Sequence, residues 1–212
     1  MKQETRLLRQ TRTMETLGRI SLALNATRDL SKLLELICKE SSELFNVGAA
    51  FIWLLEGEDL VGFAGYGYRR EDFIGLRVSL LESPILGPRV IREKRPIYVN
   101  DAPNSDKTDP NLITHFNTKA ILGTPLIADN QAIGALMLLD TEDPYKFREE
   151  DIELAELLGS HAAIAITNAR LYEEISERVK ESNQRNAELE ALRKASFHLT
   201  ANLELKPLLE AI

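Results

Sequence analysis

The stretch formed by residues 119–158 constrains the fold more than any other part of the sequence. Two apolar runs of strand length, residues 120–127 and 132–139, flank the polar tetrad at 128–131, which reads ADNQ. Asp and Asn tolerate the left-handed backbone of a tight turn, so this spacing predicts a β-hairpin. Both runs are apolar almost throughout, which indicates that other elements cover both faces of the sheet.

The remaining segments predict further helices and strands around this hairpin. Helices are expected over residues 4–26, from Thr27 or Asp29 through the apolar positions up to Phe45, from Ser83 and Pro84 to before Pro96, over 112–118, and from about 148 to 200. Strands are expected over 48–55, 60–68, 76–80 and 96–99, the last at a sheet edge because proline donates no hydrogen bond. Residues 100–111 are rich in Asn, Asp, Pro and Ser and predict a long surface loop.

Two features near these elements leave alternatives open. Cys38 flanks the apolar face of the second helix, where we expect a buried hydrophobic side chain rather than a reactive thiol. The strand at 60–68 contains Gly62, Gly65 and Gly67. These glycines either leave room for a ligand or mark a twisted or bulged strand.

Composition and charge limit the classes of function. The 212-residue chain has a formal net charge of -7, so it lacks the basic footprint of a nucleic-acid-binding protein. No apolar run approaches the roughly 20 residues that span a bilayer, and the first residues lack the apolar core of a signal peptide. A single cysteine fits a reducing compartment. We therefore expect a cytoplasmic segment that contacts neither nucleic acid nor membrane.

The long C-terminal helix carries a narrow apolar stripe that is typical of a helical dimer. Beyond its apolar first half, apolar and small polar residues recur at alternating steps of three and four. The seam predicted from this pattern consists of Tyr172, Ile175, Val179, Asn186 and Leu189. An Asn within such a seam costs stability but sets the register of a parallel pair, which predicts a weak, adjustable homodimer. The alternative is a solvated helix that pairs only at high concentration.

An internal repeat predicts how the segment is divided. Residues 17–37 align without a gap with residues 192–212 and share a Leu-rich pattern. We therefore expect a linker helix at 1–16, a folded domain at 17–172, a coiled-coil helix at 173–202 and, at 203–212, the truncated start of a second, similar module of a longer protein.

The order of elements resembles that of a GAF domain. The similarity is carried by the run REKRPIYVND at 92–101, the hairpin ILGTPLIADNQAIGALMLLD at 121–140 and the helix FREEDIELAELLGSHAAIAITNARLYEEI at 147–175. The resemblance implies an α+β fold: a six-stranded antiparallel sheet with helices on both faces and long signalling helices at the two ends. It also implies a pocket walled by residues 67–82 and 100–118. The ligand contacts expected there are Trp53, Tyr66, Tyr68, Phe73, Asp101, His115, Phe116 and Thr124.

Motifs of individual GAF subfamilies can be compared with this sequence. Cyclic-nucleotide members end their motif in Phe-x-x-x-Asp-Glu; Phe147 and Asp151 fit, but Ile152 replaces the Glu and no Asn-Lys pair precedes it, which disfavours a cyclic nucleotide. Bilin-binding members use a Cys-His pair, whereas Thr114 precedes His115, so a bilin is disfavoured too. Methionine sulfoxide reductases of this family need paired cysteines, and the single Cys38 of this sequence cannot supply them. His115 could hydrogen-bond an acid or ligate haem, although haem is not the expectation.

Together these observations predict a regulatory module rather than an enzyme. The sequence contains no G-x-S-x-G elbow, phosphate-cradling loop or H-E-x-x-H motif, and its three histidines are too scattered for a metal cluster. We expect the module to bind a small molecule and to relay a conformational signal through a dimer of its N- and C-terminal helices. The expected output domain is a histidine kinase or a cyclic-dinucleotide enzyme. The alternative is a ligand-free dimerisation or spacer module.

Overall fold

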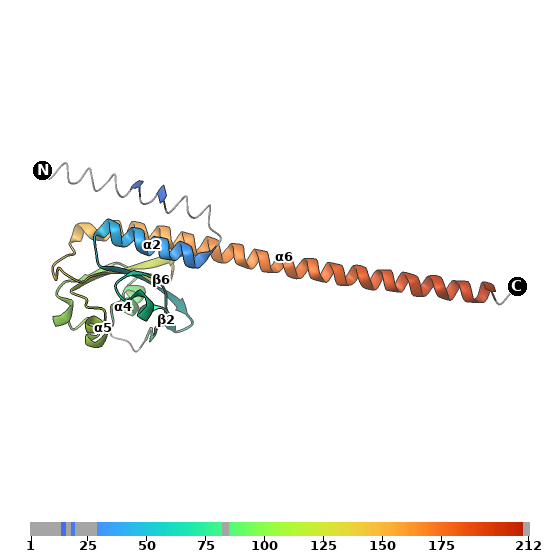
Figure 1. Ribbon diagram of the computed structural model, residues 1–212, viewed down its shortest axis with the longest axis horizontal. Coiled ribbons are helices and arrows are strands. Elements are labelled where there is room, and N and C mark those ends of the chain that lie inside the picture. Colours follow the sequence, from blue (N-terminus) through green and yellow to red (C-terminus); the bar gives the residue numbers. More distant parts are fainter. Residues whose placement is uncertain (1–13, 16–17, 20–28, 82–84, 210–212) are drawn as a thin grey trace. The chain divides into compact units, whose positions relative to one another are not determined.

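The computed structural model describes residues 14–15, 18–19, 29–81 and 85–209, and in the last range it describes side chains as far as residue 194. Six strands form one antiparallel sheet in the order β3-β2-β1-β6-β5-β4, with helices on both of its faces (Figure 1). The expected six-stranded α+β architecture is therefore confirmed.

The predicted central hairpin is confirmed as β5 (Ala120–Ala128) and β6 (Gln131–Asp140). Asp129 and Asn130 form its two-residue turn with φ values of 49° and 62°. Positive φ at both turn residues matches the twist of the flanking strands, which is why Asp and Asn suit these positions. Strands β5 and β6 lie inside the sheet, and this explains their continuous apolar character.

The second hairpin pairs β1 (Ala49–Glu56) with β2 (Asp59–Gly67), and β2 continues the sheet to β3 (Arg77–Ser79). Between the pairs Ile52–Ala64 and Trp53–Gly62 the register shifts, so β2 contains a β-bulge at Phe63. At the other end of the sheet, β4 (Ile97–Val99) is an edge strand, as predicted from Pro96.

The glycines of β2 leave room for neighbouring parts of the protein itself. A Cβ atom at Gly62 would lie 2.2 Å from the backbone oxygen of Phe73, and one at Gly65 would lie 2.7 Å from the Phe51 ring. Gly67 has a φ of 93° and adjoins the Gly48 carbonyl. The bulged-strand alternative is therefore correct, and these glycines do not mark a ligand.

One face of the sheet packs against α2 (Leu30–Phe45) and the first part of α6 (Glu149–Leu209), which run side by side in Figure 1. Asp29 caps α2 by accepting a hydrogen bond from the Lys32 N–H, one of the two caps expected. Cys38 is 0% exposed in this core, and burial raises the pKa of its thiol. It is a structural side chain, as predicted.

The opposite face packs against three short helices: α3 (Arg70–Phe73), α4 (Leu86–Glu93) and α5 (Pro110–His115). A 3-10 turn, η1 (Ala102–Asn104), lies within the predicted loop. Ser83 and Pro84 lie outside the described residues; among those described, α4 begins at Leu86 after Ile85. Helix α5 begins at Pro110 rather than at residue 112, because Asp109 caps it by accepting hydrogen bonds from the Asn111 and Leu112 N–H groups.

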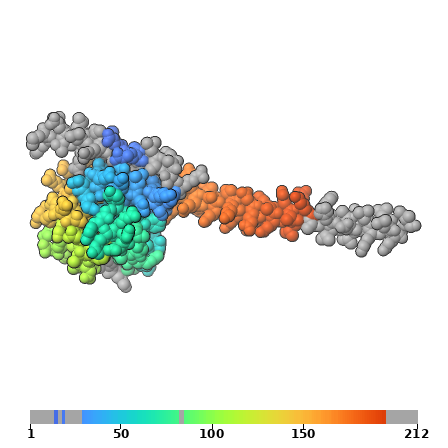
Figure 2. Space-filling view, in the orientation of Figure 1, coloured from blue at the N-terminus to red at the C-terminus, as the bar shows by residue number. Residues whose placement is uncertain are grey.

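Helix α6 is 61 residues long and begins one residue from its predicted start. It continues through Pro207 to Leu209, so the predicted end near residue 200 was wrong. The chain divides into two units, Met1–Ala169 and Arg170–Ile212, and α6 contributes to both. Residues 170–194, the orange to red part of α6 in Figure 2, all have exposed side chains.

Most of the predicted N-terminal helix, residues 4–26, lies outside the described residues. The four residues that are described there, 14–15 and 18–19, are helical, and Arg19 forms an ion pair with Glu40 of α2. Among the described helices, none combines the length and apolar character that a bilayer-crossing helix requires.

Candidate functional site

A small cavity of about 60 Å³ lies on the side of the sheet that packs against α3, α4 and α5. Strand β1 contributes Phe51 and Trp53. Helix α3 contributes Phe73, and Phe116 follows the last residue of α5. Alternation along β1 directs residues 51 and 53 to the same face. The cavity therefore lies between the middle of the sheet and the short helices that cover it.

Four aromatic rings form one continuous wall of this cavity. The rings of Phe51 and Phe73 stack with centroids 4.4 Å apart and planes at 13°. Trp53 meets Phe73 edge-on at 4.6 Å, and Phe116 meets Phe51 edge-on at 5.3 Å. Stacked and edge-to-face arrangements are the favourable geometries for aromatic pairs, so these contacts hold the wall in shape.

Polar side chains are few in the cavity lining, and most are already engaged. The Thr108 hydroxyl donates to the Ala102 carbonyl at 2.8 Å, and the Asp109 carboxylate caps α5. Thr118 differs, because its hydroxyl is buried and has no hydrogen-bond partner in the described part of the chain. The oxygen is enclosed by the protein, so Thr118 is a buried polar group that the surrounding packing leaves unsatisfied.

The local backbone explains how Thr118 comes to lie beside the cavity. Asn117, with a φ of 48°, ends the turn after α5. The Thr118 N–H then donates to the Ile113 carbonyl at 2.9 Å, and the Lys119 N–H donates to the Asp140 carbonyl at 2.7 Å as β5 begins. Both backbone bonds hold residue 118 between α5 and the sheet.

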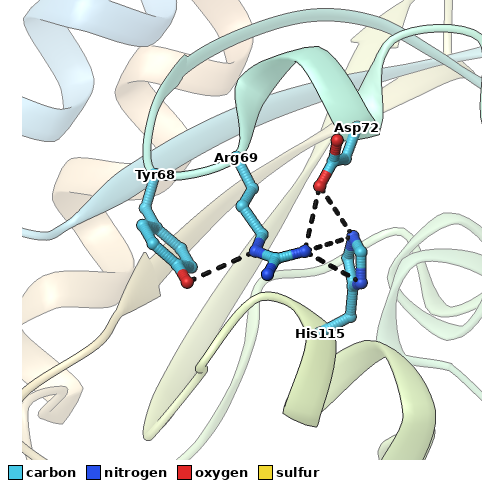
Figure 3. A network of polar contacts seen from close by, with 4 residues as sticks. All are labelled: Tyr68, Arg69, Asp72 and His115. Carbon is cyan, nitrogen blue, oxygen red and sulfur yellow. Dashed lines mark hydrogen bonds and ion pairs between the residues drawn. The ribbon is translucent and has the colours of Figure 1, made fainter.

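Beside the aromatic wall, a polar network joins α3 to α5 (Figure 3). The Asp72 carboxylate lies 3.0 Å from Nε2 of His115 and accepts a hydrogen bond from Nη1 of Arg69 at 3.1 Å. Arg69 also donates through Nε to the Tyr68 hydroxyl at 3.3 Å. The bonds to Tyr68 and then to Asp72 raise the pKa of the Arg69 guanidinium. All members of this polar network are exposed at the surface.

The structure brings together five of the eight predicted ligand contacts. Trp53, Phe73 and Phe116 line the cavity, and Tyr68 and His115 belong to the adjoining polar network.

The other three predicted contacts lie elsewhere. Asp101 is at the start of η1 and accepts hydrogen bonds from the Asn104 side chain. Tyr66 packs against the core on the α2 side of the sheet. Thr124 adjoins Gly159 of α6 and lines a separate hollow of about 170 Å³ together with Glu156.

Several cavity residues were not among the predicted contacts. Phe51 shares its face of β1 with Trp53, so its position could have been predicted. Met137 follows from the register, since it pairs with Phe51 across β1 and β6. Thr118 had no comparable signal, because its position beside the cavity depends on the turn that precedes it.

The described residues offer no group of three or more His, Cys, Asp and Glu side chains that could hold a metal ion. The buried Cys38 lies in the core on the α2 side of the sheet, away from the cavity lining. The arrangement therefore consists of a largely apolar cavity and, beside it, a surface polar network.

Comparisons with known proteins relate this arrangement to one family. A family model described as "GAF domain" matches residues 27–167, more than half of the chain. The chain is 27% identical over 169 residues to the anaerobic nitric oxide reductase transcription regulator NorR of Aeromonas hydrophila. It is 29% identical over 93 residues to the circadian input-output histidine kinase CikA of Thermosynechococcus vestitus.

These two alignments cover 79% and 43% of this chain, but only 33% of NorR and 13% of CikA. Among solved structures, the GAF domain from a phosphoenolpyruvate-protein phosphotransferase of Coxiella burnetii matches with a TM-score of 0.67 and 24% identity. That alignment covers 77% of this chain and 98% of that domain. At this identity, the structural match supports the fold alone.

Proposed function

The chain belongs to the GAF domain family, and from this premise we propose that it is a sensory module that binds a small molecule in the aromatic cavity and passes the change to an output domain through α6. The observation that carries the proposal is the largely apolar cavity between the sheet and the short helices, which Phe51, Trp53 and Phe116 line. Small-molecule sites combine an apolar lining with a few polar groups that orient the ligand.

Strand β5 supplies a physical connection between the cavity and α6. Ile121 of β5 lines the cavity on one face of the sheet. Three residues further along β5, Thr124 faces the other side of the sheet. A Cβ atom added to Gly159 of α6 would lie 3.0 Å from the Thr124 hydroxyl oxygen. Glycine allows this close approach, so a shift of β5 would act on α6 directly. A ligand that prefers one position of β5 would bias α6 by its difference in affinity for the two states.

We further propose that α6 pairs with α6 of a second copy. The seam residues Tyr172, Ile175, Val179 and Leu189 are 53–71% exposed, an apolar stripe that a partner helix would cover. Leu157, Ile164 and Leu171, which are 39–53% exposed, recur every seven residues along the same helix. The N-terminal helix, expected to join this dimer, lies mostly outside the described residues.

The relatives support a regulatory output. NorR is by name a transcription regulator and CikA a histidine kinase. We propose a histidine kinase as the output domain of the full-length protein, as in CikA, and a cyclic-dinucleotide enzyme as the other candidate. The proposal gives this chain no catalytic step of its own.

A second candidate is a ligand-free spacer, which the tight stacking of Phe51 on Phe73 favours. A thermal-shift screen of small metabolites separates the two functions, because a ligand raises the unfolding free energy by RT ln(1 + [L]/Kd). We expect at least one compound to raise Tm in the wild-type chain. Leu112→Phe, which enlarges a half-buried lining residue, should abolish that rise. A screen in which no compound raises Tm favours the spacer.

A further inference from the structure

The polar side chains in and beside the α6 seam favour one orientation of the proposed helix pair. Resting on the pairing in the proposed function, we infer that α6 binds α6 of a second copy in parallel and in register, so that each seam residue faces its own copy. Both copies then carry a signal in the same direction along one pair of helices. The residues that carry this inference belong to the segment 170–194, whose side chains are all exposed.

The spacing of the seam determines which residues would meet across the pair. Two sets of positions recur every seven residues: the first set is Tyr172, Val179 and Asn186, and the second is Ile175, Ser182 and Leu189. In a parallel pair in register, each residue of either set faces its own copy. In an antiparallel pair, residues of the first set face residues of the second. The two orientations therefore give the polar residues different neighbours.

Asn186 distinguishes the two orientations from inside the seam. In the parallel pair the two Asn186 side chains face each other, and the amide N–H of one can donate to the carbonyl oxygen of the other. In an antiparallel pair whose seams overlap fully, Asn186 faces Ile175 of the other copy. Both amides would then be buried against apolar side chains without a partner, which destabilises that arrangement.

Arg185 and Glu190 distinguish the orientations at the edges of the seam. Neither side chain forms an ion pair within the part of the chain that the structure describes. In the parallel pair Arg185, just before Asn186, lies beside Glu190, just after Leu189, of the other copy, and this contact occurs twice. In the antiparallel pair Arg185 lies beside Arg178 of the other copy, again twice. The flanking charges therefore attract in the parallel pair and repel in the antiparallel pair.

Two other contacts act in the opposite direction. The antiparallel pair would bring Leu171 beside Leu192 of the other copy, and the parallel pair brings Arg193 beside its own copy. Leu171 and Leu192 flank the seam, so their contact would cover only part of each side chain. Arg193 follows the last apolar layer, at Leu189, where a long side chain can turn its guanidinium toward water. Neither contact offsets two buried amides without partners and two pairs of like charges.

Distances between spin labels on the outer face of α6 test the orientation. Glu177→Cys and Ala191→Cys, at positions opposite the seam, are each labelled in the 212-residue chain that also carries Cys38→Ala. Double electron–electron resonance then measures the distance between the labels of the two copies. In the parallel pair both positions should give the same distance, because equivalent residues lie at one level. In an antiparallel pair the labels would be separated along the helix axis by about 30 Å at residue 191 but only about 10 Å at residue 177.

Charge reversal tests the same inference without labels. Arg185→Glu places like charges beside each other at Glu190 of the parallel pair and should weaken association about fivefold or more. Adding Glu190→Arg to the same chain should restore association. In an antiparallel pair Arg185→Glu would lie beside Arg178 and tighten association instead. Lys180→Glu makes the same change in net charge away from the seam, serves as the control and should leave association nearly unchanged.

Sedimentation equilibrium separates a wrong orientation from a wrong pairing. If the wild-type chain associates but the label distances at 177 and 191 differ as the antiparallel pair requires, or if Arg185→Glu tightens association, the parallel pair is refuted and the proposed pairing stands. Equal weakening by Arg185→Glu and Lys180→Glu would also refute the contact between Arg185 and Glu190. If the wild-type chain does not associate at any concentration, α6 does not pair and both proposals are wrong.

Discussion

Nε2 of His115 lies 3.0 Å from Oδ2 of Asp72, and the residues that follow them in the chain, Phe116 and Phe73, line the cavity. This contact therefore joins α3 to α5 (Figure 3). The Phe73 and Phe116 rings next to it in the chain lie 6.4 Å apart, centroid to centroid. The exposed contact between His115 and Asp72 thus helps to fix the positions of the buried Phe73 and Phe116 rings.

Removing the pair should alter local opening more than overall stability. His115 and Asp72 are 43% and 46% exposed, and exposed pairs contribute up to about 1 kcal/mol. We expect His115→Ala to lower the unfolding free energy by less than about 1 kcal/mol while hydrogen exchange in α5 accelerates. Arg178→Ala, which breaks an exposed pair on α6, serves as the control and should leave α5 unchanged. Unchanged exchange in both variants would contradict a role of the pair in holding α5.

The Thr118 hydroxyl, which has no hydrogen-bond partner among the described residues, predicts an unusual response to substitution. Replacing a buried hydroxyl that lacks a partner removes an uncompensated polar group, so Thr118→Val should leave stability unchanged or raise it by up to about 1 kcal/mol. Thr108→Val is the matched control, since that hydroxyl donates to the Ala102 carbonyl and its loss should cost about 1 kcal/mol. Urea denaturation measures both. A clear loss of stability in Thr118→Val would mean that its hydroxyl is bonded.

Two glycines near the cavity should respond oppositely to alanine. A Cβ at Gly87 in α4 would meet Leu60 and Trp53 at 3.6–3.9 Å, which are ordinary contacts. Gly87→Ala should therefore raise the unfolding free energy by about 0.5–1 kcal/mol through its higher helix propensity. Gly62→Ala would place its Cβ 2.2 Å from the Phe73 carbonyl oxygen and should cost at least about 2 kcal/mol. Thermal denaturation of both variants checks the packing of α3 and α4 on the sheet.

The buried thiol of Cys38 makes stability depend on alkaline pH. Burial raises its pKa in the folded chain, so the thiol stays protonated there while the unfolded thiol ionises above its ordinary pKa of about 8.5. The stabilisation is complete below that pH and is lost as pH rises, by up to about 1.4 kcal/mol per pH unit. The difference in unfolding free energy between the wild-type chain and Cys38→Ala should fall accordingly between pH 8 and 10. A constant difference would indicate an accessible thiol.

The pairing proposed for α6 is tested at its polar seam position. Asn186→Leu should tighten association tenfold or more, because a leucine gains apolar burial in the seam. Gln184→Leu adds the same side chain on the opposite face of the helix and should not. Sedimentation equilibrium measures both dissociation constants. Equal effects of the two variants would place the contact surface elsewhere.

Local patterns predicted most of the fold. The Asp129-Asn130 turn and the apolar runs beside it specify the central hairpin, and the spacing of Leu33, Leu34 and Ile37 identifies the buried face of α2. Helix ends were less predictable: Asp109 and Pro110 start α5 earlier than expected, and α6 passes through Pro207. Propensity alone does not determine where a long helix stops.

The candidate site was predicted in part, for a reason that lies in β2. Leu60 and Gly62 face the cavity side, but the bulge at Phe63 reverses the alternation, so Tyr66 faces α2. A bulge of this kind depends on pairing with β1 and is not visible in the alternation itself. Thr124 is different, because alternation along β5 groups it with Leu122 on the α6 side, a signal that was present in the sequence.

Dimer dissociation measured with the cavity filled and empty tests the central claim most directly. Binding and dimerisation that are coupled must affect each other reciprocally, and typical couplings of about 1–3 kcal/mol change affinity about fivefold or more. We expect the sedimentation-equilibrium dissociation constant of the wild-type chain to change at least fivefold when a compound that raises Tm in the thermal-shift screen is present at saturation, and less in Leu112→Phe at the same concentration of that compound. A dissociation constant that stays the same with the cavity saturated would contradict a relay from the cavity to α6.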